Sequence, residues 1–312
     1  MINREEFWYD SRDGETKIHA VRWLPECEKP VLIVQIVHGM AEYAMRYEGF
    51  AQFLAGKGVL VVANDHLGHG LSRREEIPYG YFCKREPATV VVRDVHRLKK
   101  MTQEQNPGIP YFLIGHSMGS FILRNYLMKY GKGIDGAVIV GSGYMPGPVT
   151  GAGLVMVALQ SVFMGEKHVS KLTDGIIFGG YNKRIKGGRT SYDWLSTQND
   201  EVDAYLADPL CGQTFTLNGF RTLLTLIHRA CAKDSLNGVP RKLPVLLLSG
   251  REDPVGGYGS GVERVFEFYL KNEMEKTTCR LYDGIRHEIL NESVREQVYE
   301  DIMTFLLKAA DI

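Results

Sequence analysis

The 312-residue sequence has no excess of either charge: 37 basic and 37 acidic side chains give a formal net charge of zero. Such a chain has no long-range field that would attract nucleic acid, so nucleic-acid binding is not expected. Cysteine is also scarce. The five cysteines are scattered without C-x-x-C spacing, which argues against a disulfide framework or a zinc site and fits reduced thiols.

The sequence also has little that would direct it to or through a membrane. Residues 1–17 are rich in charge and lack the apolar region, about 7–15 residues long, of a secretory signal. We therefore expect a cytoplasmic protein. The longest apolar stretch, residues 154–159 with 162–164, is interrupted by Gln160 and Ser161 and is expected to be too short to span a bilayer.

Nucleotide and metal motifs are missing as well. There is no Walker A sequence, and the G-x-G that begins at Gly141 has Pro146 where a dinucleotide fingerprint needs its third glycine. The pair His66 and His69 has half of a metal-site spacing but no evident second group of ligands. No cofactor and no metal are therefore expected.

Short aliphatic runs alternate with amphipathic segments along most of the chain. An antiparallel pair of edge strands is expected at 7–10 and 16–24. Further strands are expected at 31–37, 59–63, 111–114, 137–140, 244–248 and 277–282, and helices at 47–57, 88–105, 262–270 and 293–307. This alternation predicts an α/β fold with a mainly parallel central sheet flanked by helices.

The alternation stops between residues 146 and 242, where no aliphatic strand occurs and amphipathic pieces stand at 154–164 and 217–230. A structureless loop of roughly a hundred residues is uncommon in a compact domain. We therefore expect a helical cap, 146–242, inserted between two parts of one core, 1–145 and 243–312. Its place in the chain would put it over the C-terminal edge of the sheet.

Ser117 is the candidate nucleophile. It stands in the sequence GHSMG (115–119), with an apolar strand before it and an amphipathic helix after it. A G-x-S-x-G turn between a strand and a helix strains the serine backbone and lifts its hydroxyl clear of the sheet. The Met118 amide would then lie at a helix N-terminus, facing a developing oxyanion. The alternative is an ordinary glycine-rich turn.

A serine nucleophile needs an imidazole base and a carboxylate that orients the imidazole. His287, between the last strand and the last helix, is the candidate base, and Asp253, after the preceding strand, is the candidate acid. Glu252 is the main alternative for the acid, and Asp253 would otherwise cap a helix that begins at Pro254. The order Ser117, Asp253, His287 is that of α/β-hydrolases.

Five segments carry a resemblance to a known family: HGMAEYAMRY (38–47), NDHLGHGLS (64–72), GHSMGS (115–120), GREDPVG (250–256) and RHEILNE (286–292). With them the chain resembles the monoacylglycerol lipase and lysophospholipase group of α/β-hydrolases, sometimes grouped with serine aminopeptidases. In the first segment Tyr43 stands where that family usually has histidine.

The resemblance implies that the amides of Met40 and Met118 form the oxyanion hole and that the cap supplies an acyl tunnel. It also implies that Glu42 and Arg46 are polar residues near the glycerol end of the substrate. Substrate identity is the least transferable of these properties, since cap sequences vary widely within the group.

These observations predict a cofactor-free serine hydrolase that cleaves monoacylglycerols or lysophospholipids through an acyl-enzyme, with Leu154 and Phe163 of the cap beside the acyl chain. The partner would be a small lipid ester, with transient membrane-surface contact through the cap. A short-chain carboxylesterase and a catalytically silent binding protein are alternatives. An aminopeptidase or amidase is another, and it would need acidic cap residues such as Asp200, Glu201 and Asp203 in the pocket.

Overall fold

The computed structural model describes residues 2–312, and within them eight strands form one sheet. The strands are β1 (Asn3–Asp10), β2 (Lys17–Leu24), β3 (Leu32–Val37), β4 (Val59–Asn64), β5 (Tyr111–His116), β6 (Gly136–Val140), β7 (Val245–Gly250) and β8 (Thr277–Tyr282). They lie in the order β1-β2-β4-β3-β5-β6-β7-β8. β2 pairs antiparallel with both β1 and β4, whereas all later neighbours pair parallel. The predicted α/β fold is confirmed.

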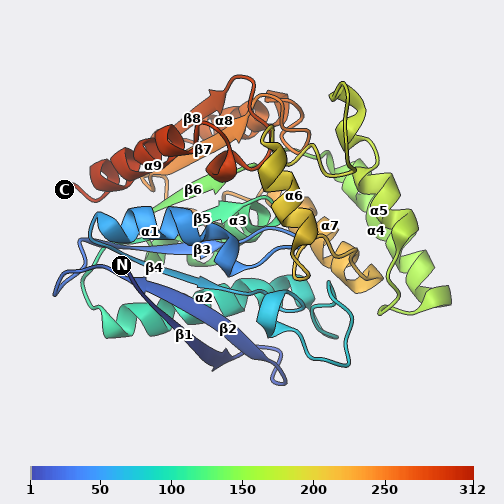
Figure 1. Cartoon of the computed structure of the whole chain (residues 1–312), viewed down its shortest axis with the longest axis horizontal. Helices are drawn as coiled ribbons and strands as arrows, with labels where there is room; N and C mark the ends of the chain where they lie inside the picture. The colour runs from blue at the N-terminus through green and yellow to red at the C-terminus, as the bar shows by residue number, and fades with distance from the viewer. Residues whose placement is uncertain (1) are drawn as a thin grey trace.

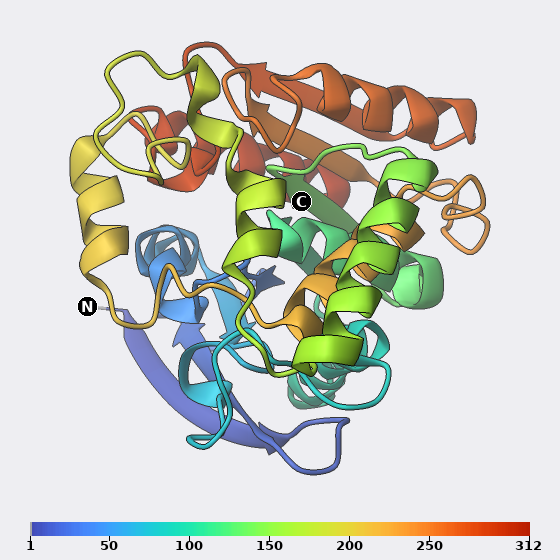
Figure 2. The same cartoon turned by 90° about the vertical axis from the view of Figure 1, so that its right-hand side faces the viewer.

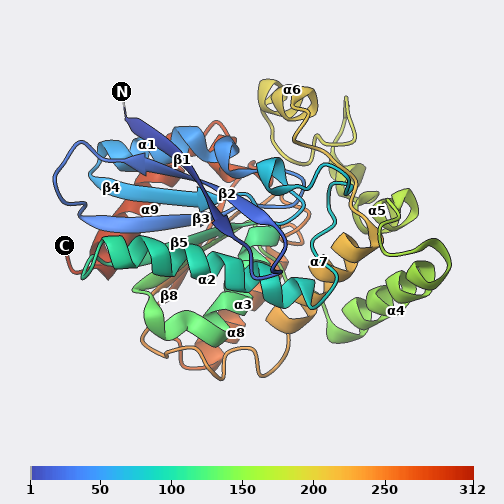
Figure 3. The ribbon, with the colours of Figure 1, turned by 90° about the horizontal axis from the view of Figure 1, so that it is seen from below.

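Helices cover both faces of the sheet (Figures 1 and 3). α1 (Glu48–Gly56) and α9 (Arg295–Ala309) pack on one face, and α2 (Pro87–Gln105), α3 (Met118–Tyr130) and α8 (Ser260–Lys271) pack on the other. Successive side chains of β3 point to opposite faces of the sheet. Ile33 lies in the core on the side of α2, α3 and α8, whereas Leu32 and Val34 lie in the core on the side of α1 and α9. Because both faces are covered, the parallel strands are aliphatic on both sides.

In the chain between β6 and β7 lie α4 (Gly147–Met164), α5 (Lys171–Phe178), α6 (Asn199–Ala207) and α7 (Leu217–Ala230). Figures 1 and 2 show α4, α5 and α6 gathered at one end of the sheet. α7 is tied to α3 by two side chains: Asn125 donates to the Leu226 carbonyl (2.9 Å) and Arg124 donates to the Ala230 carbonyl (2.7 Å). α4 packs on α7 in turn, so the segment is anchored to the core through α7.

α4 is longer than the sequence analysis expected. It has 18 residues, about 27 Å at 1.5 Å per residue. Of the helices in the described chain, it alone is long and apolar enough to cross a membrane by length and composition, and 11% of it is buried. The expectation of a stretch too short to span was therefore wrong. Ser161 does not interrupt the helix, because its hydroxyl donates to the Val157 carbonyl (2.8 Å) one turn earlier.

The turn between β5 and α3 brings two backbone segments into close contact. Ser117 has φ 54° and ψ −121°, a conformation that residues with a side chain rarely adopt. A Cβ at Gly119 would lie 1.9 Å from the Val37 carbonyl oxygen, and one at Gly115 would lie 2.5 Å from the Gly119 carbonyl oxygen. Neither position has room for a side chain, which explains both glycines of the GHSMG sequence.

We expect Gly119→Ala to destabilise the protein by about 1–3 kcal/mol or more, because the added methyl must push apart two packed backbone segments. Gly151→Ala in α4 is the control, since a Cβ there meets nothing within 4 Å and alanine favours the helix by up to about 1 kcal/mol. Denaturant unfolding measures both. Equal stability of the two variants would contradict the steric explanation.

Candidate active site

Ser117, Asp253 and His287 follow the C-terminal ends of β5, β7 and β8, respectively. Because parallel strands end at a common edge, these three loops converge. His287 Nδ1 lies 2.9 Å from Asp253 Oδ2, and both side chains are buried. Ser117 and His287 line one cavity. The alternative acid, Glu252, is exposed.

The surroundings of Asp253 favour its charged form. Burial alone would raise the pKa of Asp253, but His287, the Ser249 hydroxyl (2.9 Å) and the Val255 amide (2.8 Å) hold the pKa below its ordinary value. Asp253 is not a helix cap, since the next helix begins at Ser260. A buried carboxylate in this position can orient the imidazole and stabilise a positive charge on it.

Two backbone amides beside Ser117 are available to an oxyanion. Met118 is the first residue of α3, so its amide has no acceptor within the helix. The Met40 amide has no acceptor among residues 2–312, and a Cβ on the preceding Gly39 would lie 3.1 Å from Ser117 Cβ. Both methionines line the cavity, so the structure brings together the residues expected to form the oxyanion hole.

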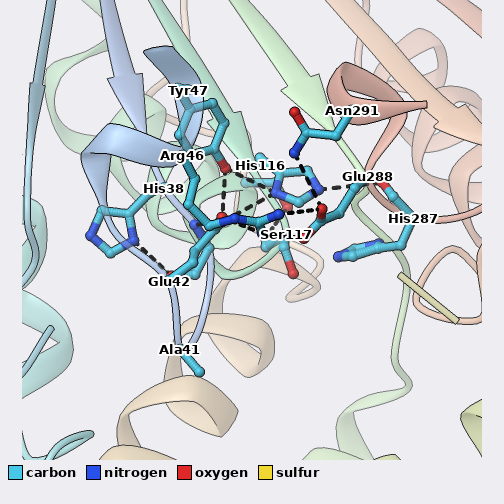
Figure 4. Close-up of polar contacts among 12 residues, drawn as sticks. His38, Ala41, Glu42, Arg46, Tyr47, His116, Ser117, His287, Glu288 and Asn291 are labelled. Carbon is cyan, nitrogen blue, oxygen red and sulfur yellow. Dashed lines mark hydrogen bonds and ion pairs between the residues drawn. The ribbon is translucent and has the colours of Figure 1, made fainter. Parts of the chain in front are cut away.

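Glu42 and Arg46 belong to a buried polar network next to Ser117 (Figure 4). Glu42 Oε1 accepts from the Gly39 amide (2.5 Å), and Arg46 forms a two-pronged ion pair with Glu288 (2.5 and 2.9 Å). Glu42 and Glu288 line the cavity, whereas Arg46 does not. The structure therefore does not support the expected direct contact of Arg46 with substrate, because its guanidinium is occupied by Glu288.

His116, the residue before Ser117, completes this network. Tyr47 bridges it to Glu42: the Tyr47 hydroxyl lies 2.8 Å from Glu42 Oε1 and 3.0 Å from His116 Nδ1. Burial alone would raise the pKa of Glu42, but His116, Arg46 and Tyr47 lower it below its ordinary value. Glu42 is therefore a carboxylate at neutral pH, and it holds the Gly39 amide through a charge-assisted hydrogen bond.

The cavity has a volume of about 730 Å³, within the range of about 300–1,000 Å³ usual for small-molecule sites. The insertion contributes a mainly apolar wall that includes Val149, Met156, Ile177, Phe178, Tyr181 and Leu224. The site thus combines a nucleophile candidate and a His–Asp pair with an apolar chamber.

Leu154 and Phe163 do not line this cavity, so the structure does not support their expected contact with an acyl chain. Val149 and Met156 lie seven residues apart, on one stripe of α4. Phe163 continues that stripe beyond the cavity and is 85% exposed, whereas Leu154 packs against the core cluster that holds Val157. Because α4 is apolar on most sides, the sequence did not show which residues would face inward.

A parallel sheet with a strained serine turn and a buried His–Asp pair at its C-terminal edge defines an α/β-hydrolase. Comparison with known families agrees with this class. The chain belongs to the serine aminopeptidase S33 family, which matches residues 28–294.

Individual relatives cover nearly the whole chain. It is 27% identical over 297 residues to a monoacylglycerol lipase of Mycolicibacterium smegmatis, covering 94% of each chain. It is 28% identical over 283 residues to the Homo sapiens monoglyceride lipase, covering 88% of this chain and 81% of the relative. A carboxyl esterase from Bacillus coagulans, solved in complex with glycerol, has a TM-score of 0.91 and 29% identity over 99% of this chain and 100% of that one.

We expect Asp253→Asn to lower turnover by about 10⁴-fold, because an amide favours the wrong imidazole tautomer. Glu252→Gln is the matched change at the exposed neighbour and should leave turnover within about twofold. Ester hydrolysis by the two purified variants, with circular dichroism to verify folding, measures this. The reverse order of effects would assign the acid to Glu252.

Proposed function

We propose that this protein hydrolyses single-chain lipid esters, either monoacylglycerols or lysophospholipids, through an acyl-enzyme formed on Ser117. The chain is an enzyme of the carboxylic ester hydrolase class. The observation that supports a single-chain lipid ester as substrate is the cavity that Ser117 and His287 share with apolar side chains of α4 and α5. Each methylene of an acyl chain buried there would contribute about 0.8 kcal/mol of transfer free energy.

In the first half of the proposed reaction, the Ser117 hydroxyl attacks the ester carbonyl while His287 Nε2 takes its proton. The Met40 and Met118 amides stabilise the negative oxygen of the tetrahedral intermediate. The imidazolium, paired with Asp253, then protonates the leaving alcohol. In the second half, water activated by His287 attacks the acyl-enzyme, which releases the fatty acid and restores Ser117.

The polar part of the cavity lining fits the alcohol portion of such an ester. Glu42 and Glu288 reach the cavity wall, and carboxylate oxygens accept hydrogen bonds from hydroxyl groups. Arg46 supports this side indirectly, by fixing Glu288.

We also propose that α4 touches lipid surfaces during substrate uptake. Outside the cavity it exposes large apolar side chains, a pattern typical of helices that lie on a membrane: Val155, Leu159, Val162, Phe163 and Met164. Two lysines, Lys167 and Lys171, are exposed just beyond its C-terminus and would suit anionic headgroups.

We expect kcat/KM on dispersed monoesters to rise with acyl length until the cavity is filled, and to be low for triacylglycerols. Met156→Ser should reduce the increment per methylene, because Met156 lines the cavity. Phe163→Ser is the matched change on the exposed part of α4; it should keep the increment and lower co-sedimentation with phosphatidylglycerol vesicles. A parent enzyme with no chain-length dependence would instead be a short-chain carboxylesterase.

A second candidate function, hydrolysis of amine-bearing esters or amides, is favoured by Asp174 in α5. Asp174 lines the cavity and is half-buried, and its carboxylate has no hydrogen-bond or ion-pair partner within residues 2–312. Burial raises its pKa. The acidic residues expected from the sequence do not line the cavity, and two of them have other partners: Asp203 pairs with Arg189 and Glu201 pairs with Arg295.

If Asp174 binds a substrate ammonium group, Asp174→Asn should lower kcat/KM for aminoacyl p-nitrophenyl esters by about 10- to 100-fold, the value of one charge-assisted hydrogen bond. Neutral monoesters of the same length should react at unchanged or higher rates, because a partly buried charge is removed. Measurement of kcat/KM for the parent and for Asp174→Asn on both substrates tests this second function. Equal effects on both would exclude this second candidate.

A further inference from the structure

The loop after β3 holds Met40 through an unfavourable backbone conformation at the next residue. Ala41 has φ 53°, in the left-handed region that costs a non-glycine residue about 1–3 kcal/mol. The φ and ψ angles of Ala41 set the orientation of the peptide before it relative to the peptide after it. Relaxation of Ala41 to negative φ would therefore change the direction of the chain at Met40. Something must therefore hold the Ala41 carbonyl in place.

The groups that hold it come from the insertion. The Ala41 carbonyl accepts two hydrogen bonds of 3.0 Å, one from the Tyr205 hydroxyl in α6 and one from the Gly212 amide just after α6. Tyr205 is buried in a small cluster with Leu195 and Cys211. The Arg46 guanidinium lies over the Tyr205 ring, 4.9 Å from its centroid. The hydroxyl is thus held in a packed, oriented position.

The same part of the chain also contacts the loop that carries His287. The Leu195 carbonyl accepts from the Glu288 amide (2.7 Å), and Arg286 donates to the Ser196 carbonyl (2.8 Å). The ring centroids of Trp194 and His287 are 5.1 Å apart. Residues 193–212 therefore touch both loops that serve the Ser117 reaction, one through Ala41 and the other through Glu288 and Arg286.

We propose that Tyr205 is a positioning residue that aligns the Met40 amide by fixing the Ala41 carbonyl from the insertion. This inference rests on the proposed role of Met40 in the oxyanion hole. It gives the insertion a part in forming the reactive site, beyond supplying a wall for the substrate, because Tyr205 and Gly212 supply two of the hydrogen bonds that hold the oxyanion loop.

Tyr205→Phe tests this role, because it removes the hydroxyl and keeps the ring on which Arg46 lies. With p-nitrophenyl butyrate, kcat should fall by about three- to tenfold, the value of one hydrogen bond, with KM within about twofold. Labelling of Ser117 by a fluorophosphonate should slow by a similar factor, since its phosphoryl oxygen needs the same donors. The melting temperature should stay close to that of the parent.

Tyr43→Phe is the matched control. The Tyr43 hydroxyl also joins the loop region to the insertion, donating to Asp208 (2.9 Å) at the end of α6; Tyr43 packs against the same cluster, and its hydroxyl does not donate to the Ala41 carbonyl. Its kcat should remain near that of the parent. Equal losses of kcat in both variants, or an unchanged kcat in Tyr205→Phe, would overturn the proposal.

p-Nitrophenyl butyrate is short and water-soluble, so its hydrolysis does not depend on whether the preferred substrate is a lipid. The test of Tyr205 therefore holds even if the proposed acyl preference is wrong. Ser117→Ala is measured first. If that variant kept its turnover, the proposed mechanism would fail on its own. If it is inactive while Tyr205→Phe equals the parent, only the positioning role of Tyr205 fails.

Discussion

Gly119 packs against the carbonyl oxygens of Val37 and His38 at the end of β3, and the geometry of the site depends on this contact. It sets the separation between the turn that carries Ser117 and the loop that leaves β3. The parallel register of β3 with β5, in which Val37 pairs with Gly115, brings the two segments to the same level. With helices packed on both faces, neither strand can shift to relieve the positive φ of Ser117. The strained backbone of Ser117 and the position of the Met40 amide beside it thus follow from the ordinary pairing of β3 with β5.

The core and the positions of Ser117, Asp253 and His287 could be predicted because their signals are local in sequence. An aliphatic run of about six residues predicts a strand buried on both faces, as in β3 and β5. The carboxyl ends of parallel strands lie at one edge of the sheet, so the loops that follow them meet there. Asp253 and His287 could therefore be placed near Ser117 without knowing any distance. The GHSMG sequence added a steric requirement that glycine alone meets.

The remaining parts of the site depend on contacts between distant positions, which leave no periodic pattern. Arg46 meets Glu288 across 242 positions, and Tyr205 meets Ala41 across 164. Single polar residues give no indication of such partners, so Arg46 was assigned to substrate rather than to Glu288. α4 shows the complementary problem: its apolar residues point in all directions, and even along the stripe that Met156 and Phe163 share, only Met156 lines the cavity.

The uncovered side of α4 also has a thermodynamic consequence that does not depend on what eventually covers it. Large apolar side chains in contact with water order the solvent around them, and their removal from water near 25 °C is driven by entropy and lowers the heat capacity. Binding of any apolar surface to α4 should therefore release little heat at room temperature, weaken on cooling, and become more exothermic as the temperature rises. The temperature at which this enzyme works would then set how much of it resides at an interface.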